Sequence, residues 1–124
     1  MNTVVWVVQV VLAIAYLAAG VLKTTQSREA LKAKGLDWVD DFSDGTVKLI
    51  GALEALGAIG LILPAVTGVL PWLTPVAALG LVVVQALAIR VHLRRGEAKV
   101  VPVNVVLLLL AAFVAWQRFG PNAF

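Results

Sequence analysis

The sequence predicts an all-α fold: an integral membrane four-helix bundle that forms one domain over residues 1–124. The composition indicates this first, with 61% hydrophobic and only 14% charged residues, against roughly 45–50% and about 25% in soluble domains. In addition, four apolar stretches approach the length of about 20 residues that crosses a bilayer as a helix. None of them alternates polar and apolar residues, which argues against strands.

The four predicted spans cover residues 3–23, 46–64, 72–93 and 101–119 approximately. The first could be mistaken for a cleaved signal peptide. However, no basic residue precedes its apolar run, and Lys23 is the first charged side chain of the chain. We therefore expect this segment to remain in the protein as a membrane span.

The predicted connections differ in length and charge. Residues 24–45 form the one long polar linker, in which Ser27 can cap a short amphipathic helix ending at Gly35. Apolar and aromatic residues suited to the headgroup boundary follow it, namely Leu36, Trp38, Val39 and Phe42. The second connection is an uncharged turn rich in proline, and the third is short and basic.

Charge places the linkers on one side of the membrane. Nine of the ten Lys and Arg residues lie on the side of the first and third connections, and Arg118 alone lies on the other. Basic residues concentrate on the cytoplasmic side of membrane proteins. We therefore expect a protein of the bacterial cytoplasmic membrane with both termini outside and both basic linkers cytoplasmic. In such a protein the net charge of +3 suits membrane lipids rather than nucleic acid.

Polar residues within the spans are the candidates for function, because an ionised group at mid-helix costs about 2.5–3.5 kcal/mol. Glu54 is the sharpest case, since it lies roughly 12 Å deep in an otherwise apolar stretch. Seven-residue spacing aligns Gln9, Tyr16 and Lys23 on one helix face, and Gln85 with His92 on another. Most of these groups fall in the cytoplasmic half, whereas the outer half offers only Gln9. The predicted pocket for a ligand or proton consists of Tyr16, Lys23, Glu54, Gln85, His92 and Asn104.

Each candidate also has a purely structural interpretation. Glu54 can serve as a polar latch between helices, Gln85 as interhelical hydrogen-bonding glue, and Asn104 as a cap. Lys23 and Arg90 can be snorkelling anchors, and His92 a headgroup contact. The chain has one histidine and no cysteine, and it contains no nucleophile–base pair or phosphate loop. We expect no metal or haem site, no catalytic residues, and no autonomous enzyme.

The residues resemble those of the DoxX-like family of small four-helix membrane proteins. The likeness rests on "YLAAGVLK", "ALKAKGLDWV", a final helix opening Pro-x-Asn, and above all the segment "GALEALGAIGLILP". The family is named after a subunit linked to thiosulfate:quinone oxidation, and relatives are associated with membrane oxidoreductase complexes. The resemblance implies that Lys23, Glu54 and Asn104 occupy the polar positions of the family pattern.

Three functions follow as expectations. The first is an accessory protein whose polar pocket binds a quinone, a lipid or a partner subunit, such as another membrane or redox protein. The second is a component of a quinone-linked oxidoreductase, in which Glu54 relays protons and Lys23 or His92 polarises a quinone carbonyl. The third is a transporter of protons or a small solute, which four short helices would form as a homo-oligomer.

Overall fold

The structure is a computed structural model that describes residues 1–124, and it confirms an all-helical fold without strands. Four long helices are each long and apolar enough to cross a membrane. They agree with the predicted spans to within three residues and have the bounds α1 Asn2–Thr25, α3 Asp44–Thr67, α4 Leu73–Arg94 and α5 Val101–Phe119. Two short elements occupy the first connection, α2 Arg28–Ala33 and the 3₁₀ helix η1 Asp37–Asp41.

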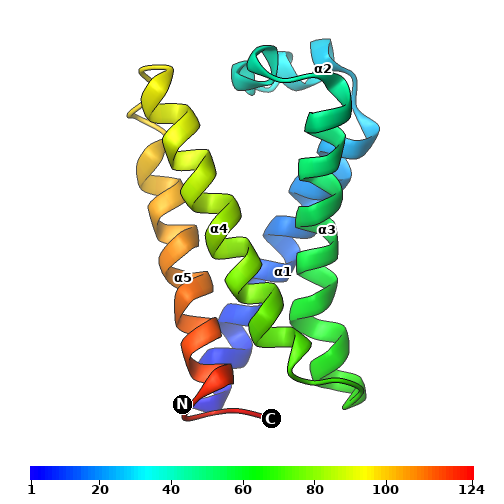
Figure 1. The fold of residues 1–124 in the computed structure, drawn as a ribbon, viewed down its shortest axis with the longest axis vertical. Helices are drawn as coiled ribbons and strands as arrows, with labels where there is room; N and C mark the ends of the chain where they lie inside the picture. Colours follow the sequence, from blue (N-terminus) through cyan, green and yellow to red (C-terminus); the bar gives the residue numbers. More distant parts are fainter.

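The helices associate as two pairs, α1 with α3 and α4 with α5, and the pairs meet through α3–α4 and α1–α5 contacts. Both chain termini lie at one end of the bundle, here called the terminal end (Figure 1). The connections that contain α2 and the α4–α5 turn lie at the other, here called the linker end. Toward the linker end the two pairs separate (Figure 1). The main core lies between them and unites residues of all four helices, namely Leu12, Ala13, Tyr16, Ala58, Leu61, Ala78, Leu81, Ala111, Val114 and Ala115.

Small residues set the closest approach, which is between α1 and α3. A Cβ atom added at Gly20 would lie 2.5 Å from the carbonyl oxygen of Gly51 and 2.7 Å from the backbone nitrogen of Ala55. Only glycine therefore fits at this crossing. Gly51 and Ala55 thus permit close contact between the helices, in agreement with small-residue packing in membranes.

Helix α3 differs from the prediction at its end, because it continues through Pro64 to Thr67 and stops at Gly68, whose φ is 71°. A proline removes one backbone hydrogen bond and leaves the carbonyl of residue i−4 without its donor. Here that carbonyl belongs to Gly60, and it accepts a hydrogen bond of 3.0 Å from the Thr74 hydroxyl of α4. The replaced hydrogen bond explains why Pro64 does not end the helix.

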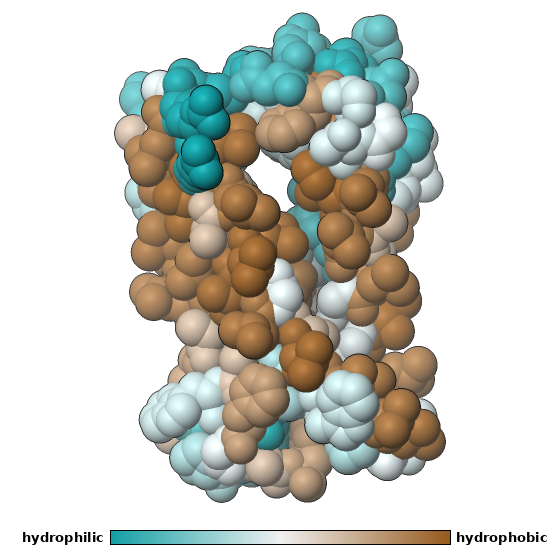
Figure 2. Space-filling model, viewed as in Figure 1, coloured by the Kyte–Doolittle hydropathy of each residue, from teal (hydrophilic) through white to brown (hydrophobic).

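The first connection folds into a cap over the linker end. Ser27 accepts a hydrogen bond from the backbone N–H of Ala30 and starts α2 as predicted, and Gly35 (φ 87°) follows the helix end. Below the cap, Leu31 and Val39 are buried against Val47 of α3. Hydrophilic residues gather over this end, while apolar residues cover most of the middle of the face shown (Figure 2).

Candidate functional site

Lys23 and Glu54 form the central contact of the candidate site. The Lys23 Nζ lies 2.5 Å from the Glu54 Oε1, and the two side chains are 13% and 4% exposed. α1 and α3 run antiparallel, so Lys23 lies one turn from Gly20 toward the linker end and Glu54 one turn from Gly51 toward the terminal end. The close glycine crossing lets the long Lys23 side chain span this difference and reach Glu54. Glu54 thus points toward a neighbouring helix, as both the pocket and the latch interpretations require, and Lys23 does not snorkel away from the bundle.

Gln85 and Asn104 meet on the other helix pair. The Asn104 amide donates a hydrogen bond of 2.8 Å to the Gln85 Oε1, which joins α5 to α4. Gln85 is buried and Asn104 half-buried. Asn104 makes no capping hydrogen bond in α5, so its side chain serves this interhelical contact instead.

Tyr16 lies between the two polar pairs. Its side chain is buried, and both the Gln85 amide and the Glu54 carboxylate are near its hydroxyl. The Gln85 side chain is close to this hydroxyl, but no atom meets the distance and angle of a hydrogen bond with it, so it is one of two buried side-chain polar atoms without such a partner. Buried polar groups are nearly always hydrogen-bonded. Tyr16 therefore offers an unused donor at the centre of the site.

The helix pairs separate directly above these residues. The tight α3–α4 contact between Gly57 and Leu81 lies one turn closer to the terminal end than Glu54 and Gln85. Beyond that contact, the space-filling view has an opening between α3 and α4, below the hydrophilic cap (Figure 2). Glu54 and Gln85, which are 3% and 4% exposed, lie one turn beyond that contact, on the side of this opening, which is here called the cleft.

An ion pair closes the cleft at the linker end. Arg95, just after α4, lies 2.9 Å from Asp41 in η1. The cap is held in turn by Arg28, which donates to the carbonyl oxygens of Val39 and Phe42 and pairs with Asp44 at 2.8 Å. The Arg95–Asp41 pair thus joins the two helix pairs above the cleft, while the Arg28 contacts hold the cap on α3.

Charged groups of the cap and the α4–α5 turn stabilise one another. The hydrogen bond from Lys32 holds the pKa of Asp40 below its ordinary value, and the hydrogen bond with Asp40 raises the pKa of Lys32. The hydrogen bond with Asp41 raises the pKa of Arg95. Opposite charges favour the ionised form of each partner, so the cap remains charged and paired around neutral pH.

His92 stands apart from the other candidates. Its Nδ1 lies 2.9 Å from the Glu97 Oε1 in the turn after α4, and it is two turns closer to the linker end than Gln85. This contact holds the pKa of Glu97 below its ordinary value. The structure therefore joins Lys23 to Glu54 and Asn104 to Gln85 and places Tyr16 near Glu54 and Gln85, whereas His92 lies apart from these five residues.

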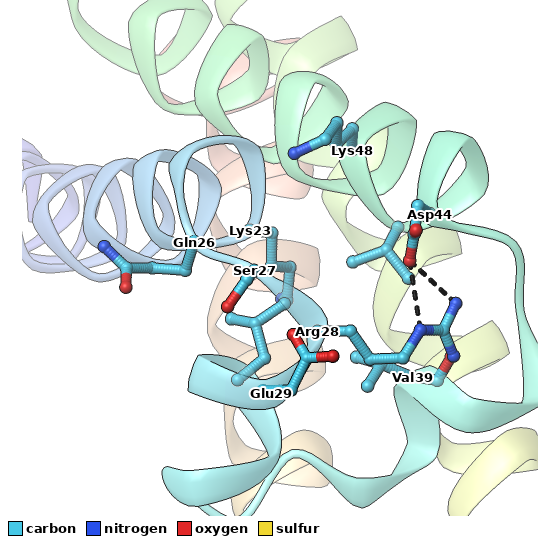
Figure 3. A pocket seen from close by; sticks show the side chains of 10 residues that line it. Lys23, Gln26, Ser27, Arg28, Glu29, Val39, Asp44 and Lys48 are labelled. Atoms are coloured by element: carbon cyan, nitrogen blue, oxygen red, sulfur yellow. Dashed lines mark hydrogen bonds and ion pairs between the residues drawn. The ribbon is translucent and has the colours of Figure 1, made fainter.

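A separate polar cavity of about 210 Å³ lies between the end of α1 and the cap, and the Arg28–Asp44 pair borders it (Figure 3). Lys23 lines this cavity as well as pairing with Glu54. Its ammonium also lies 5.6 Å from the centre of the Trp38 ring. Lys23 is thus the link between the buried carboxylate and a polar space under the cap.

The terminal end corrects the expectation that Gln9 is the only polar group there. Arg118 is 3% exposed, and its Nε donates to the Gln9 Oε1 at 2.5 Å. Gln9 in turn donates to the carbonyl oxygen of Leu61 at 2.8 Å. The sequence contained a sign of this contact, because the first and last of four helices run antiparallel and bring their outer ends together. The charge pattern alone uses Arg118 only as the single basic residue of the outer side and does not predict this contact.

Comparison with known families matches residues 7–114 to the model of the DoxX-like family. The chain belongs to the DoxX-like family. No curated protein and no solved structure matches it. The resemblance found in the sequence is therefore confirmed, over most of the chain.

In this DoxX-like protein the most specific segment, residues 51–64, is a packing surface with one charged group. Gly51 meets α1, while Gly57 and Gly60 meet Leu81 and Ala77 of α4. Glu54 lies between these contacts and reaches Lys23. The small residues let both neighbouring helices approach α3 closely, and that approach encloses the carboxylate.

Proposed function

We propose that this DoxX-like protein is an accessory membrane protein that binds a small amphipathic molecule, such as a quinone or a lipid, in the cleft. The observation that carries the proposal is the buried Tyr16 hydroxyl, which has no hydrogen-bond partner although it lies near Glu54 and Gln85. A ligand oxygen at this position would accept a hydrogen bond that the protein leaves unmade.

The surroundings of the cleft suit a ligand with a polar head and an apolar tail. The head would lie among Tyr16, Glu54 and Gln85. Apolar side chains cover most of the middle of the face shown (Figure 2), so a tail leaving between α3 and α4 would pass directly into the hydrocarbon. Ligand sites combine mostly apolar walls with a few polar groups that fix orientation, and this arrangement meets that description.

The charge asymmetry of the sequence supports an orientation for the proposal. With the linker end facing the cytoplasm, the Lys23 cavity would lie on the cytoplasmic side and the cleft would open into the cytoplasmic leaflet. A bacterial cytoplasmic membrane location belongs to this proposal, and reagent labelling of a cysteine introduced at Ala33 would test it.

A second candidate function is participation in a quinone-linked oxidoreductase. The observation that favours it is the position of Lys23, which lines the polar cavity and also pairs with Glu54. Such a pair could pass a proton between the cavity and a quinone in the cleft. This role requires a redox partner, because the chain has no cysteine and one histidine.

Quenching of tryptophan fluorescence in the detergent-purified protein tests the proposal. A short-chain quinone and a phospholipid are titrated separately. Tyr16→Phe removes only the hydroxyl, and we expect it to weaken binding about tenfold, the effect of one lost hydrogen bond of about 1.4 kcal/mol. Arg90→Gln, at an exposed site on α4, is the control and should bind like the unmodified protein. Equal binding by Tyr16→Phe and the unmodified protein would reject the cleft as the site.

A further inference from the structure

Arg118 at the terminal end is a buried cation without an anionic partner. It is 3% exposed and forms no ion pair with any carboxylate. Three of its N–H groups have acceptors: the Nε donates to Gln9, and the Nη1 donates to the Asn2 Oδ1 at 2.6 Å and to the Asn122 carbonyl oxygen at 2.8 Å. The Nη2 is buried and has no partner. Both of its hydrogens are unused.

The chain itself offers no carboxylate side chain to complete this site. Six of its seven acidic residues, namely Glu29, Asp37, Asp40, Asp41, Asp44 and Glu97, belong to the two connections of the linker end or to the first turn of α3, and Glu54 is paired with Lys23. A buried charge is costly unless it is paired. Arg118 is therefore available to an anionic group of another molecule.

The surroundings of Arg118 indicate the depth and the chemistry of that molecule. Trp116 and Phe119, which flank it in sequence, and Trp72 of the neighbouring turn are more than half exposed. Exposed tryptophans mark the level of lipid headgroups. A guanidinium nitrogen with two free N–H groups can donate to the oxygens of a phosphate, and arginine is a common phosphate ligand.

We propose that Arg118 binds a phosphate group at the terminal end of the bundle, supplied by a phospholipid headgroup at the membrane boundary. The rings of Phe124 and Trp6 cover the guanidinium. The Phe124 ring lies 4.1 Å from the Arg118 Cζ and is 49% exposed, so its displacement would open the guanidinium to the headgroup layer. This inference is independent of the cleft, which lies toward the opposite end.

Native mass spectrometry of the full chain, released from micelles that contain phosphatidylglycerol, tests the proposal. We expect the unmodified protein to retain one phospholipid, and Arg118→Gln to bind it at least about tenfold more weakly, since hydrogen bonds to a charged group exceed 1.4 kcal/mol. Arg94→Gln removes an exposed arginine of the linker end and should leave retention unchanged. Equal retention by folded Arg118→Gln and the unmodified protein would overturn the proposal.

Phe124→Ala keeps the experiment decisive if Arg118→Gln does not fold. Loss of the Phe124 ring should raise phospholipid retention, because Arg118 becomes more accessible. Unchanged or reduced retention would mean that the aromatic ring, and not a phosphate, satisfies Arg118, and would overturn the proposal.

Inorganic phosphate in lipid-free micelles distinguishes a lipid phosphate from a soluble one. Stabilisation of the unmodified protein by phosphate, absent in Arg118→Gln, would support the same site with a soluble anion. If a partner protein were cross-linked to the terminal end, and neither lipid nor phosphate had any effect, the phosphate site at Arg118 would be contradicted.

Discussion

The ion pair between Lys23 and Glu54 supports a quantitative prediction. Lys23→Met keeps the length of the side chain and removes its charge, so the Glu54 carboxylate, 4% exposed, loses its charged partner. Removing one member of a buried ion pair costs about 3–5 kcal/mol. Because Lys23 keeps 13% exposure and water can replace part of the contact, we expect the lower end, about 3 kcal/mol of unfolding free energy.

Removing both charges should have a much smaller effect. The attraction across 2.5 Å is roughly 7 kcal/mol at an effective dielectric constant of about 20, but the desolvation of both ions offsets most of it. Lys23→Met combined with Glu54→Leu should therefore unfold within about 1 kcal/mol of the unmodified protein. The single and double variants form a cycle that isolates the coupling between the two charges.

Unfolding in mixed micelles with increasing denaturing detergent, followed by circular dichroism, measures these differences. Lys48→Met is the matched control, because the exposed Lys48 donates only to the carbonyl oxygen of Thr24, at 3.2 Å, and should change stability by less than about 0.5 kcal/mol. If Lys23→Met were as stable as this control, or if the double variant lost as much as the sum of the single ones, the buried pair would not have the role assigned to it.

Three further predictions concern packing, hydrogen bonding and pH. Gly20→Ala places a Cβ 2.5 Å from the Gly51 carbonyl oxygen, so we expect about 1–3 kcal/mol of destabilisation in the same unfolding assay. Asn104→Leu leaves the buried Gln85 without its 2.8 Å donor and should cost about 1–2 kcal/mol by the same measurement. The pKa of Asp40 is lowered from its ordinary 3.8, so its contribution is complete above pH 3.8 and is lost as the pH falls through the lower folded value. Tryptophan fluorescence of the cap should accordingly be constant from about pH 7 to 5 and change only in strong acid.

Controls separate each effect from general damage. Gly80→Ala adds a methyl group where no atom lies within 4 Å and should be neutral or stabilising in the same helix-rich background. A loss equal to that of Gly20→Ala would show that helix contact is not the cause. If Asn104→Leu were as stable as the unmodified protein, the hydrogen bond between Asn104 and Gln85 would not contribute to stability. A cap transition near pH 6 would contradict the assignment to Asp40.

Much of the fold follows from the sequence because the bilayer imposes simple lengths. The apolar runs predict four helices, and Ser27 marks the start of α2 through the capping contact that it makes. Pro64 misled the prediction of a helix end, since its effect depends on Thr74, a residue ten positions later that supplies the missing donor to Gly60. Such a replacement depends on how two helices pack and is not visible in either segment alone.

The candidate site could be predicted only in part for the same reason. Seven-residue spacing places Gln9, Tyr16 and Lys23 on one face of α1, and all three side chains do face the bundle. Spacing along one helix cannot reveal which neighbour each residue meets. Tyr16 finds no hydrogen-bond partner, and Gln9 meets Arg118 from the far end of the chain.

Mass spectrometry of the small molecules retained after gentle detergent extraction tests the central claim most directly, with the unmodified protein and Tyr16→Phe purified side by side. The account predicts that a quinone or lipid accompanies the unmodified protein in close to equal molar amount, and that Tyr16→Phe loses most of it while still folding. A protein that carries no such molecule, or carries it equally in both forms, would contradict a ligand site in the cleft.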